Sequence, residues 1–323
     1  MKNIIIGMTK NNFEVLRAGI NTTYQDLGRN NLNYIGIPFS GAMDSRNYLI
    51  SNQLVGNNKH TPTIEFAYQG PLIKFNGKEI SIAITGNVNF NIIRRNSKLE
   101  KGNCYQCYNL NEGDQVDIIS TDKSVYGYLS VSGGFEAELF GESCSTNTKA
   151  EVGANNGQRL KQGDKILISK TEKNTQKRKI NYINTKIEQI RVIKGTNFDY
   201  FSEEGKKIFF NNSFKVSKFS DRMGMRIEGQ KIENIINTNI KSEGLIKGVI
   251  QVPADGNPII MLSDHGTIGG YPKIGVVISA DYDKVVQIIP GSKIKFKEVS
   301  LLEAENLFKL YNLETKNILN QIR

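Results

Sequence analysis

The sequence has few residues that support metal, redox or disulfide chemistry. Its 323 residues include three cysteines and two histidines. Cys104 and Cys107 form a CxxC motif with no second such pair and no histidine nearby, whereas a zinc site needs about four ligands. A small, odd number of cysteines is typical of a reducing compartment. We therefore expect these two cysteines to be thiols carried by a strand, with no metal site.

Long apolar runs and nucleotide-binding motifs are also missing. No window approaches the roughly 18 apolar residues of a membrane span, and the N-terminal apolar run is too short for a signal peptide. These absences favour a soluble cytoplasmic protein without a membrane partner. The sequence contains neither a P-loop nor a glycine-rich dinucleotide fingerprint after a strand. Ala42 and Met43 precede an aspartate, not the lysine of the AMKM signature, so we expect no biotin on this chain.

Positive charge is in excess but is spread along the chain. The formal net charge is +10, and the one short basic run, 177–179, lies in a stretch with few apolar residues. A nucleic-acid interface requires cations gathered on one face with aromatic residues between them. We therefore expect a lysine-rich solvated surface and no nucleic-acid partner. The apolar-poor stretch suggests a linker at 173–187 between an N-terminal domain, 1–172, and a C-terminal domain, 188–323.

Short β-type segments predominate. They lie between Gly, Asn and Asp residues, at 80–85, 126–131, 249–252, 259–262 and 274–278. A glycine turn leading into an alternating strand recurs at 112–118, 162–168 and 290–296. The last two come just before the linker and the C-terminal segment, which suggests two β-rich domains that end in similar strands. Helical spacing and capping residues predict helices only at 44–55, 199–210 and 301–322. The sequence therefore predicts a mainly β protein with a few peripheral helices.

The stretch GIPFSGAMD, 36–44, places a serine just before a predicted helix. A nucleophile elbow would need glycines two residues away on each side, but Gly36 is four residues before Ser40 and Gly41 follows it directly. Ser40 or Asp44 can instead cap the helix. A helix start preceded by Gly and Ser also offers backbone amides to an anion. We expect Ser40 to cap, to present amides to a ligand, or to do both.

Three other stretches are rich in polar groups. Residues 21–29 fit either a structured turn or a polar-ligand site that contains an arginine for a carboxylate or phosphate. Residues 220–226 fit either surface arginines or an oxyanion clamp. Residues 252–258 predict a hairpin turn. After it, Gly269 and Gly270 allow a ligand to approach the backbone, and a hydroxyl, a phenol and an ammonium are available from Thr267, Tyr271 and Lys273.

Taken together, these stretches resemble the allophanate hydrolase subunit 2 family, also called the biotin-dependent carboxyltransferase family. The resemblance is carried by NTTYQDLGRNNLNYIGIPFSGAMD, SDRMGMRIEG and EGLIKGVIQVPADGNPIIMLSDHGTIGGYPKIGVVISAD, and it extends from about residue 14 to about residue 297. It implies two cyclophilin-like β-barrel domains. CYQC and 171–185 do not belong to the pattern.

The resemblance also implies an activity that needs partners. It implies a subunit of an ATP-dependent 5-oxoprolinase, which opens the lactam 5-oxoproline to L-glutamate together with subunit-A-like and subunit-B-like proteins. ATP and Mg²⁺ would then bind in the assembled complex. Two alternatives are a carboxyltransferase component of a biotin-dependent, urea-type carboxylase and a non-catalytic partner of a subunit-B-like kinase inhibitor.

For lactam opening, we expect a carboxylate clamp and donors to a developing oxyanion. Arg222 or Arg29 would be the clamp, and Lys273 with Tyr271 would contact the polarised oxygen or a phosphate. Asp255, Asp26 and Asp44 would orient these groups. The ligand-binding candidates on these motifs are Thr23, Gln25, Asp26, Arg29, Ser40, Asp44, Asp221, Gln251, Thr267, Gly269 and Gly270.

Overall fold

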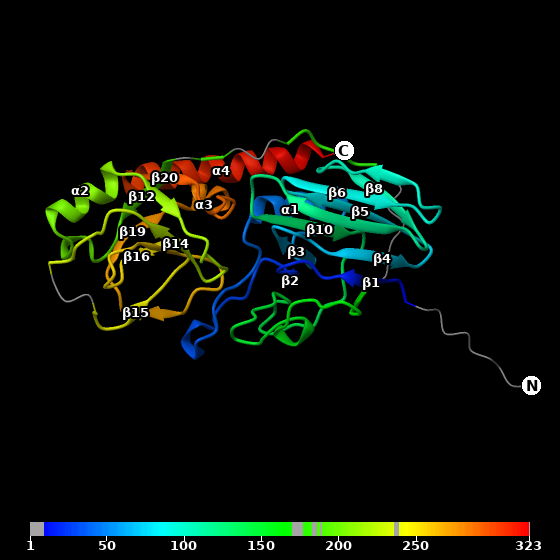
Figure 1. Ribbon diagram of the computed structural model, residues 1–323, viewed down its shortest axis with the longest axis horizontal. Coiled ribbons are helices and arrows are strands. Elements are labelled where there is room, and N and C mark those ends of the chain that lie inside the picture. The colour runs from blue at the N-terminus through cyan, green and yellow to red at the C-terminus, as the bar shows by residue number, and fades with distance from the viewer. Residues whose placement is uncertain (1–9, 170–176, 183–185, 188, 236–238, 323) are drawn as a thin grey trace, which may run out of the picture.

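The computed structural model describes residues 10–169, 177–182, 186–187, 189–235 and 239–322. Two β-rich lobes lie side by side, and a long C-terminal helix runs across both (Figure 1). We call residues 10–169 the N-lobe and residues 189–300 the C-lobe. The predicted boundary at 172 and two parts of the predicted linker, 173–176 and 183–185, lie outside the described residues, so the domain limits stay predictions.

The N-lobe consists of two antiparallel sheets. The six-stranded sheet has the order β11-β1-β4-β9-β6-β7 and the five-stranded sheet the order β2-β3-β10-β5-β8. The first contains β1 (Asn12–Arg17), β4 (Leu72–Asn76), β6 (Val88–Ile93), β7 (Leu99–Lys101), β9 (Gln115–Thr121) and β11 (Lys165–Leu167). The second contains β2 (Thr23–Gln25), β3 (Thr63–Ala67), β5 (Glu79–Thr85), β8 (Cys107–Asn111) and β10 (Tyr126–Val131). Alternate side chains of both sheets, among them Phe13, Phe66 and Phe90, fill one core between them.

The C-lobe is a closed barrel of seven strands in the order β12-β19-β16-β17-β14-β13-β20. These strands are β12 (Gln189–Lys194), β13 (Phe214–Val216), β14 (Gly224–Glu228), β16 (Val249–Gln251), β17 (Ile259–Met261), β19 (Lys273–Val277) and β20 (Lys293–Glu298). A separate pair, β15 (Glu243–Gly244) and β18 (Ile268–Gly269), lies beside the barrel. Phe209 stacks on Phe296 inside the lobe, with ring centroids 4.4 Å apart.

Helices are few, and the first of them along the chain is largely buried. They are α1 (Ser45–Leu54), α2 (Glu203–Asn211), α3 (Ser279–Val285) and α4 (Leu301–Gln321), with short 3-10 turns η1 (Asn33–Ile35), η2 (Asn155–Gly157) and η3 (Phe198–Tyr200). No described helix combines the length and the apolar character that crossing a membrane requires. The predicted mainly β class is therefore confirmed.

The predicted elements match the structure, with two differences. All five apolar runs are strands, the three glycine turns lead into β9, β11 and β20, and the hairpin at 252–258 joins β16 to β17. The predicted helix at 199–210 begins only at Glu203, because the Ser202 side chain caps it there. Helix α3 was not predicted: its N-cap residue Ile278 supplies no capping side chain, and Asp281 and Asp283 interrupt its apolar positions.

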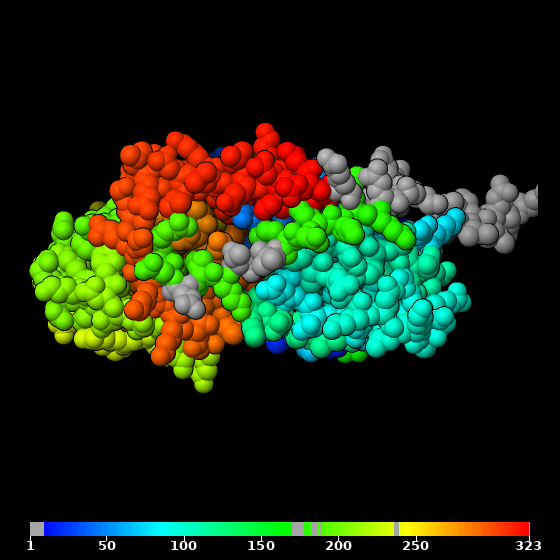
Figure 2. All heavy atoms as spheres, turned by 90° about the horizontal axis from the view of Figure 1, so that it is seen from above, coloured from blue at the N-terminus to red at the C-terminus, as the bar shows by residue number. Residues whose placement is uncertain are grey.

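The lobes share an apolar interface that α4 crosses. Met43, Tyr48 and Tyr126 of the N-lobe belong to the same buried cluster as Leu262 and Val285 of the C-lobe. From above, α4 extends from the barrel to the N-lobe (Figure 2).

Arg46 of α1 attaches α4 to the interface. Its Nε donates to Thr315 Oγ1 over 3.0 Å and its Nη2 to the Tyr311 carbonyl over 3.1 Å. Its guanidinium carbon also lies 4.1 Å from the centroid of the Tyr311 ring. One N-lobe side chain therefore holds the middle of a helix that belongs to the other end of the chain.

Replacing Arg46 with methionine is expected to lower the free energy of unfolding by about 1–3 kcal/mol, because buried hydrogen bonds to a charge and a cation–π contact are lost. Denaturant unfolding measures this loss. Lys309→Met, at an exposed position of the same helix, is the control and should change stability by less than about 0.5 kcal/mol. Equal losses in the two variants would contradict the role of Arg46.

Candidate functional site

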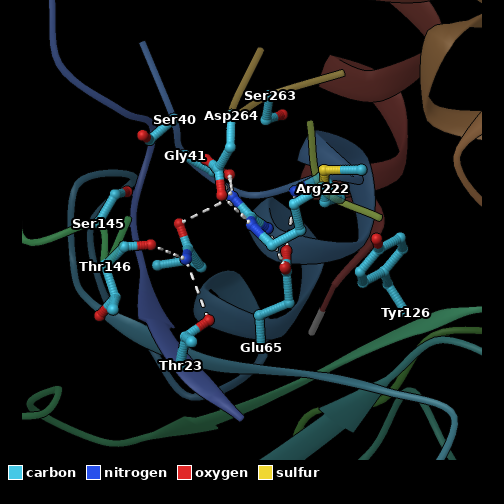
Figure 3. A network of polar contacts seen from close by, with 12 residues as sticks. Thr23, Ser40, Gly41, Glu65, Tyr126, Ser145, Thr146, Arg222, Ser263 and Asp264 are labelled. Atoms are coloured by element: carbon cyan, nitrogen blue, oxygen red, sulfur yellow. Dashed lines mark hydrogen bonds and ion pairs between the residues drawn. The ribbon is translucent and has the colours of Figure 1, made fainter. Parts of the chain in front are cut away.

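Arg222, which precedes β14, extends its side chain into the interface between the lobes (Figure 3). Its Nε donates to Asp264 Oδ2 over 2.7 Å, and its Nη2 donates to Asp264 Oδ1 over 3.2 Å and to the Gly41 carbonyl over 2.7 Å. Its Nη1 forms an ion pair with Glu65 of β3. One guanidinium thus joins a C-lobe turn to two separate segments of the N-lobe. We call Arg222, Asp264 and Glu65 the charge centre.

The charge centre is buried. Glu65 is 1% exposed, Asp264 5% and Arg222 8%. Burial acts against the charge of Arg222, but Asp264 and Glu65 outweigh it and hold the pKa of Arg222 well above its usual value. Burial raises the pKa of Glu65, against the opposing influence of Arg222. Protein oxygens already accept hydrogen bonds from both ends of this guanidinium. It therefore joins the two lobes, and it does not offer a pair of free N–H groups to the carboxylate of a ligand.

The loop before α1 is held in place by the charge centre. Glu65 Oε2 accepts from the Met43 amide over 2.8 Å and from Tyr128 Oη over 2.7 Å, and Tyr128 Oη accepts from the Asp44 amide over 2.7 Å. Asp44 caps the helix, because its Oδ1 accepts from the Asn47 amide over 2.9 Å. Successive amides of this loop therefore have fixed acceptors.

Ser40 does not cap α1, so of the two caps considered Asp44 is the right one. The Ser40 Oγ accepts from Asn147 Nδ2 over 3.0 Å, and the Ser40 amide donates to the Ser263 carbonyl over 2.9 Å. Its φ is +57°, a left-handed conformation that is uncommon for a residue with a side chain. Ser40 thus fixes the loop against both the 143–153 segment and the C-lobe turn.

Two aspartates meet at the start of α1. Asp283 of α3 accepts from the amides of Ser45 and Arg46, each over 3.0 Å, while Asp44 also accepts from Gln287 Nε2 over 2.8 Å. Burial, together with the charge of Asp283, raises the pKa of Asp44 to about 7. A carboxyl whose pKa is raised by folding binds its proton more tightly in the folded chain, so its contribution to stability is lost as pH rises towards the folded pKa.

Asp44→Asn removes this titration and keeps a capping side chain. Between pH 4 and pH 7 the wild type is expected to lose about 2–4 kcal/mol of stability that the variant keeps, since each pKa unit corresponds to about 1.4 kcal/mol. Denaturant unfolding at several pH values measures the difference, with exposed Asp221→Asn as the control. A variant whose stability falls between pH 4 and pH 7 as steeply as that of the wild type would contradict the assignment.

The 21–29 segment is a structured turn whose polar groups are engaged inside the N-lobe. Asp26 accepts from Ser143 Oγ and Ser145 Oγ, each over 2.6 Å, and from the Cys144 amide over 2.8 Å. Arg29 is 2% exposed and donates from Nε to the Phe140 carbonyl over 3.2 Å. These contacts hold the 140–145 loop against the segment.

Gln25 and Thr23 belong to the surroundings of Arg222. Gln25 Nε2 donates to Thr23 Oγ1 and to the Thr146 carbonyl, each over 3.0 Å, and its Oε1 lies 3.4 Å from Arg222 Nη2 (Figure 3). The structure therefore brings together seven of the predicted residues at or beside the lobe interface. They are Thr23, Gln25, Asp26, Arg29, Ser40, Asp44 and Arg222.

Lys273 belongs to a second group, around β15 and β18. Its ammonium forms an ion pair with Glu243 at 2.5 Å, and its described polar contacts all lie within the C-lobe. Gln251 Nε2 donates to the Tyr271 carbonyl over 3.0 Å, and Gly269 pairs with Glu243 across the two strands. Tyr271 is 38% exposed. The predicted ligands Thr267 and Gly270 lie in the same strand-and-turn region.

Asp255 and Asp221 are exposed turn residues. Asp255 accepts from the Asn257 amide within its own hairpin over 3.1 Å, and Asp221 accepts from the Met223 amide over 2.9 Å. Arg226 is exposed on β14 while Arg222 is buried before the strand, so these two arginines do not share a face. The roles of all these residues stay predictions.

Sequence reasoning gave no role to Glu65, Asp264 or Lys247. A signal existed for Glu65, which is the only charged residue in the buried strand Thr63–Ala67. Asp264 lies in a stretch noted for its polar groups, but only barrel closure shows that it faces Arg222. Lys247 stands among lysines that are spread over the whole sequence, and no local pattern distinguishes it.

A cavity of about 190 Å³ opens between the lobes beside the charge centre. Arg222, Asp264 and Tyr126 line it, and the exposed cations Lys149 and Arg159 lie on its N-lobe side. Drug-sized ligands occupy roughly 300–1,000 Å³, so this cavity suits a molecule the size of an amino acid. Among the described residues, no three His, Cys, Asp or Glu side chains are grouped to hold a metal ion.

Comparison with known sequences decides the family. Residues 35–298 match the family described as carboxyltransferase domain, subdomain A and B. The chain belongs to this family. The predicted resemblance is therefore confirmed.

Relatives are similar along nearly the whole chain. The C subunit of 5-oxoprolinase from Escherichia coli (strain K12) is 31% identical over 297 residues, which cover 90% of this chain and 92% of the relative. The C subunit of 5-oxoprolinase from Haemophilus influenzae is 32% identical over 294 residues, which cover 91% and 93%. The crystal structure of Kluyveromyces lactis urea carboxylase superposes with a TM-score of 0.85 at 28% identity, over 95% of this chain and 29% of that one.

Proposed function

We propose that this chain is the C component of an ATP-dependent 5-oxoprolinase, which opens 5-oxoproline to L-glutamate together with subunit-A-like and subunit-B-like proteins. The observation that carries this proposal is the end-to-end similarity to two proteins named as the C subunit of 5-oxoprolinase, which covers 92% and 93% of their lengths. The similarity to urea carboxylase covers only 29% of that chain. A urea-type carboxylation would therefore need parts that lie outside this sequence.

The structure supports a role inside a complex. The charge centre and the capped loop before α1 fix the lobe interface as a rigid frame, which suits the positioning of a small substrate. The sequence carries no nucleotide-binding motif, and we place the nucleotide at an interface with a partner subunit. We propose no residue of this chain as a ligand of ATP or Mg²⁺. We expect the complex to act in the cytoplasm, which supplies ATP.

Two substrates, supplied in separate reactions, distinguish the two activities. The chain is mixed with a subunit-A-like and a subunit-B-like protein and supplied with ATP. It receives either 5-oxoproline or urea with bicarbonate. The proposal predicts glutamate from 5-oxoproline, with no effect of avidin. A carboxylated product from urea that avidin abolishes would instead support the biotin-dependent alternative. Binding to the subunit-B-like protein without turnover of either substrate would favour a regulatory role.

A further inference from the structure

Lys247 has aromatic neighbours where a buried lysine would ordinarily have a carboxylate. It lies on the loop between β15 and β16 and is half-buried. Its Nζ is 4.4 Å from the ring centroid of Tyr282 and 5.6 Å from that of Phe39. Among the described residues the ammonium has no hydrogen bond and no ion pair. Its donors are therefore free for a ligand.

His265 offers a free acceptor. Its Nδ1 lies 2.6 Å from the carbonyl oxygen of Gly266. Because a carbonyl oxygen only accepts, Nδ1 carries the hydrogen, and Nε2 of the neutral ring has a lone pair. Nε2 has no partner among the described residues. Burial, with the nearby charge of Lys247, lowers the pKa of His265 against the opposing influence of Gly266 and Asp264, so the ring is neutral at pH 7.

A chain of contacts links the segments that carry these two groups. The Ser40 amide donates to the Ser263 carbonyl, and Ser263 Oγ lies 3.3 Å from Tyr282 Oη. Lys247 packs on the ring of that tyrosine and, on its other side, on Phe39, the residue before Ser40. His265 follows Ser263 by two residues in the same turn. The charge of Lys247 also acts on the His265 ring, so two groups that have no hydrogen-bond partner among the described residues lie near each other where the lobes meet.

The remaining charged groups around Lys247 are few. Burial lowers the pKa of Lys247, the carboxylate of Asp283 acts against this, and Arg222 acts with it. Asp283 already accepts from two amides of α1 and from Tyr311. Arg222 is committed to the charge centre. Neither group forms a hydrogen bond or an ion pair with the ammonium.

We propose that Lys247 and His265 form a binding site for the edge of a cyclic amide, with the ammonium donating to the carbonyl oxygen and Nε2 accepting from the amide N–H. A lactam ring is a cis amide, so its N–H and C=O lie on the same edge and meet such a pair together. The trans amide of an ordinary peptide points these groups in opposite directions. The identification of the amide as 5-oxoproline rests on the proposed function, whereas the chemical class does not. An ammonium at the carbonyl oxygen also favours the negative charge that develops there when the ring opens.

The two histidines make this site directly observable by NMR. His60 is exposed in a loop and serves as an internal reference. In the chain labelled with ¹⁵N-histidine, His265 is expected to be the Nδ1–H tautomer. Both 5-oxoproline and 2-pyrrolidinone, the same lactam without the carboxylate, should shift the His265 signals and leave those of His60 unchanged. Glutamate and inorganic phosphate should shift neither.

Three results would overturn the inference. They are an Nε2–H tautomer, a response to phosphate without a response to 2-pyrrolidinone, and no response to either lactam in the chain alone and in the assembled complex.

Lys247→Met should weaken lactam binding roughly 10- to 100-fold, as the loss of a hydrogen bond to a charged group implies, and should raise the pKa of His265. Exposed Lys241→Met is the matched control and should do neither. Lys247→Arg keeps the charge and reports whether the loop still folds. If His265 responds to lactams while the assembled complex makes no glutamate, the site stands and the proposed function fails. If glutamate forms and Lys247→Met binds lactams like the wild type, the function stands and the site fails.

Discussion

Replacing Arg222 with methionine is expected to lower the free energy of unfolding by about 3–5 kcal/mol, because the change leaves two buried carboxylates without their common partner. Glu65 and Asp264 approach the same guanidinium from different lobes, so its removal sets like charges near each other in a site from which water is excluded. Urea unfolding at pH 7 measures the loss. Arg226→Met, four residues further on and exposed, is the matched control and should stay within about 0.5 kcal/mol of the wild type.

The pH dependence of this variant gives a second, independent result. Without Arg222, the influence that opposes burial is lost, and the pKa of Glu65 in the folded chain should rise further above that in the unfolded chain. The variant then keeps more of its stability at pH 5 and loses it as the pH rises towards 8. A further variant with Arg222→Met, Glu65→Gln and Asp264→Asn removes all three charges and should recover part of the loss. A pH-independent loss would contradict the account of the charge centre.

The second large effect is expected on activity in the assembled complex. His265→Gln and Lys247→Met should each lower kcat/KM for 5-oxoproline by roughly 10²- to 10³-fold, the size of effect found when a donor to a developing oxyanion or a proton-accepting side chain is removed. Neither change should prevent assembly with the partner subunits. Initial rates of glutamate formation, with complex formation checked by size-exclusion chromatography, measure the effect.

Lys273 is the informative comparison, because the sequence predicts a catalytic role for it and the structure pairs it with Glu243. If Lys247 is the functional ammonium, Lys273→Met should change kcat/KM far less than Lys247→Met, apart from any loss of stability. A larger loss of kcat/KM in Lys273→Met than in Lys247→Met would support the catalytic role of Lys273 and contradict that of Lys247. Lys241→Met again serves as the control.

Much of the fold could be predicted from local pattern. Alternation after a glycine turn marked strands such as Gln115–Thr121 and Lys293–Glu298, because one residue in two packs against a core. The family pattern led to Arg222 and to the loop before α1. The choice between Ser40 and Asp44 as the cap was open in the sequence, since both residue types accept from free amides, and only the contact to Asn147 shows where Ser40 is used.

The centre of the site depends on contacts between distant segments. Glu65 and Arg222 lie 157 positions apart, and nothing in the spacing of either relates one to the other. Lys247 and His265 stand out because, among the described residues, no carboxylate pairs with the ammonium of Lys247 and no donor meets Nε2 of His265. Which side chains lack a partner in the folded chain cannot be predicted from the neighbouring residues in the sequence. Lys273, by contrast, stood in a glycine-rich stretch that suggested a ligand, but the strand pairing of β15 with β18 supplies it with Glu243.

The measurement that tests the central claim most directly is glutamate formation by the two partner proteins, with and without this chain. Subunit-A-like and subunit-B-like proteins are incubated with 5-oxoproline and ATP while the chain is titrated from zero to excess, and glutamate and ADP are measured together. The account predicts no glutamate without the chain and a rate that rises until the chain matches its partners in amount. Full activity in its absence, or no glutamate from a complex shown to be assembled, would contradict the account.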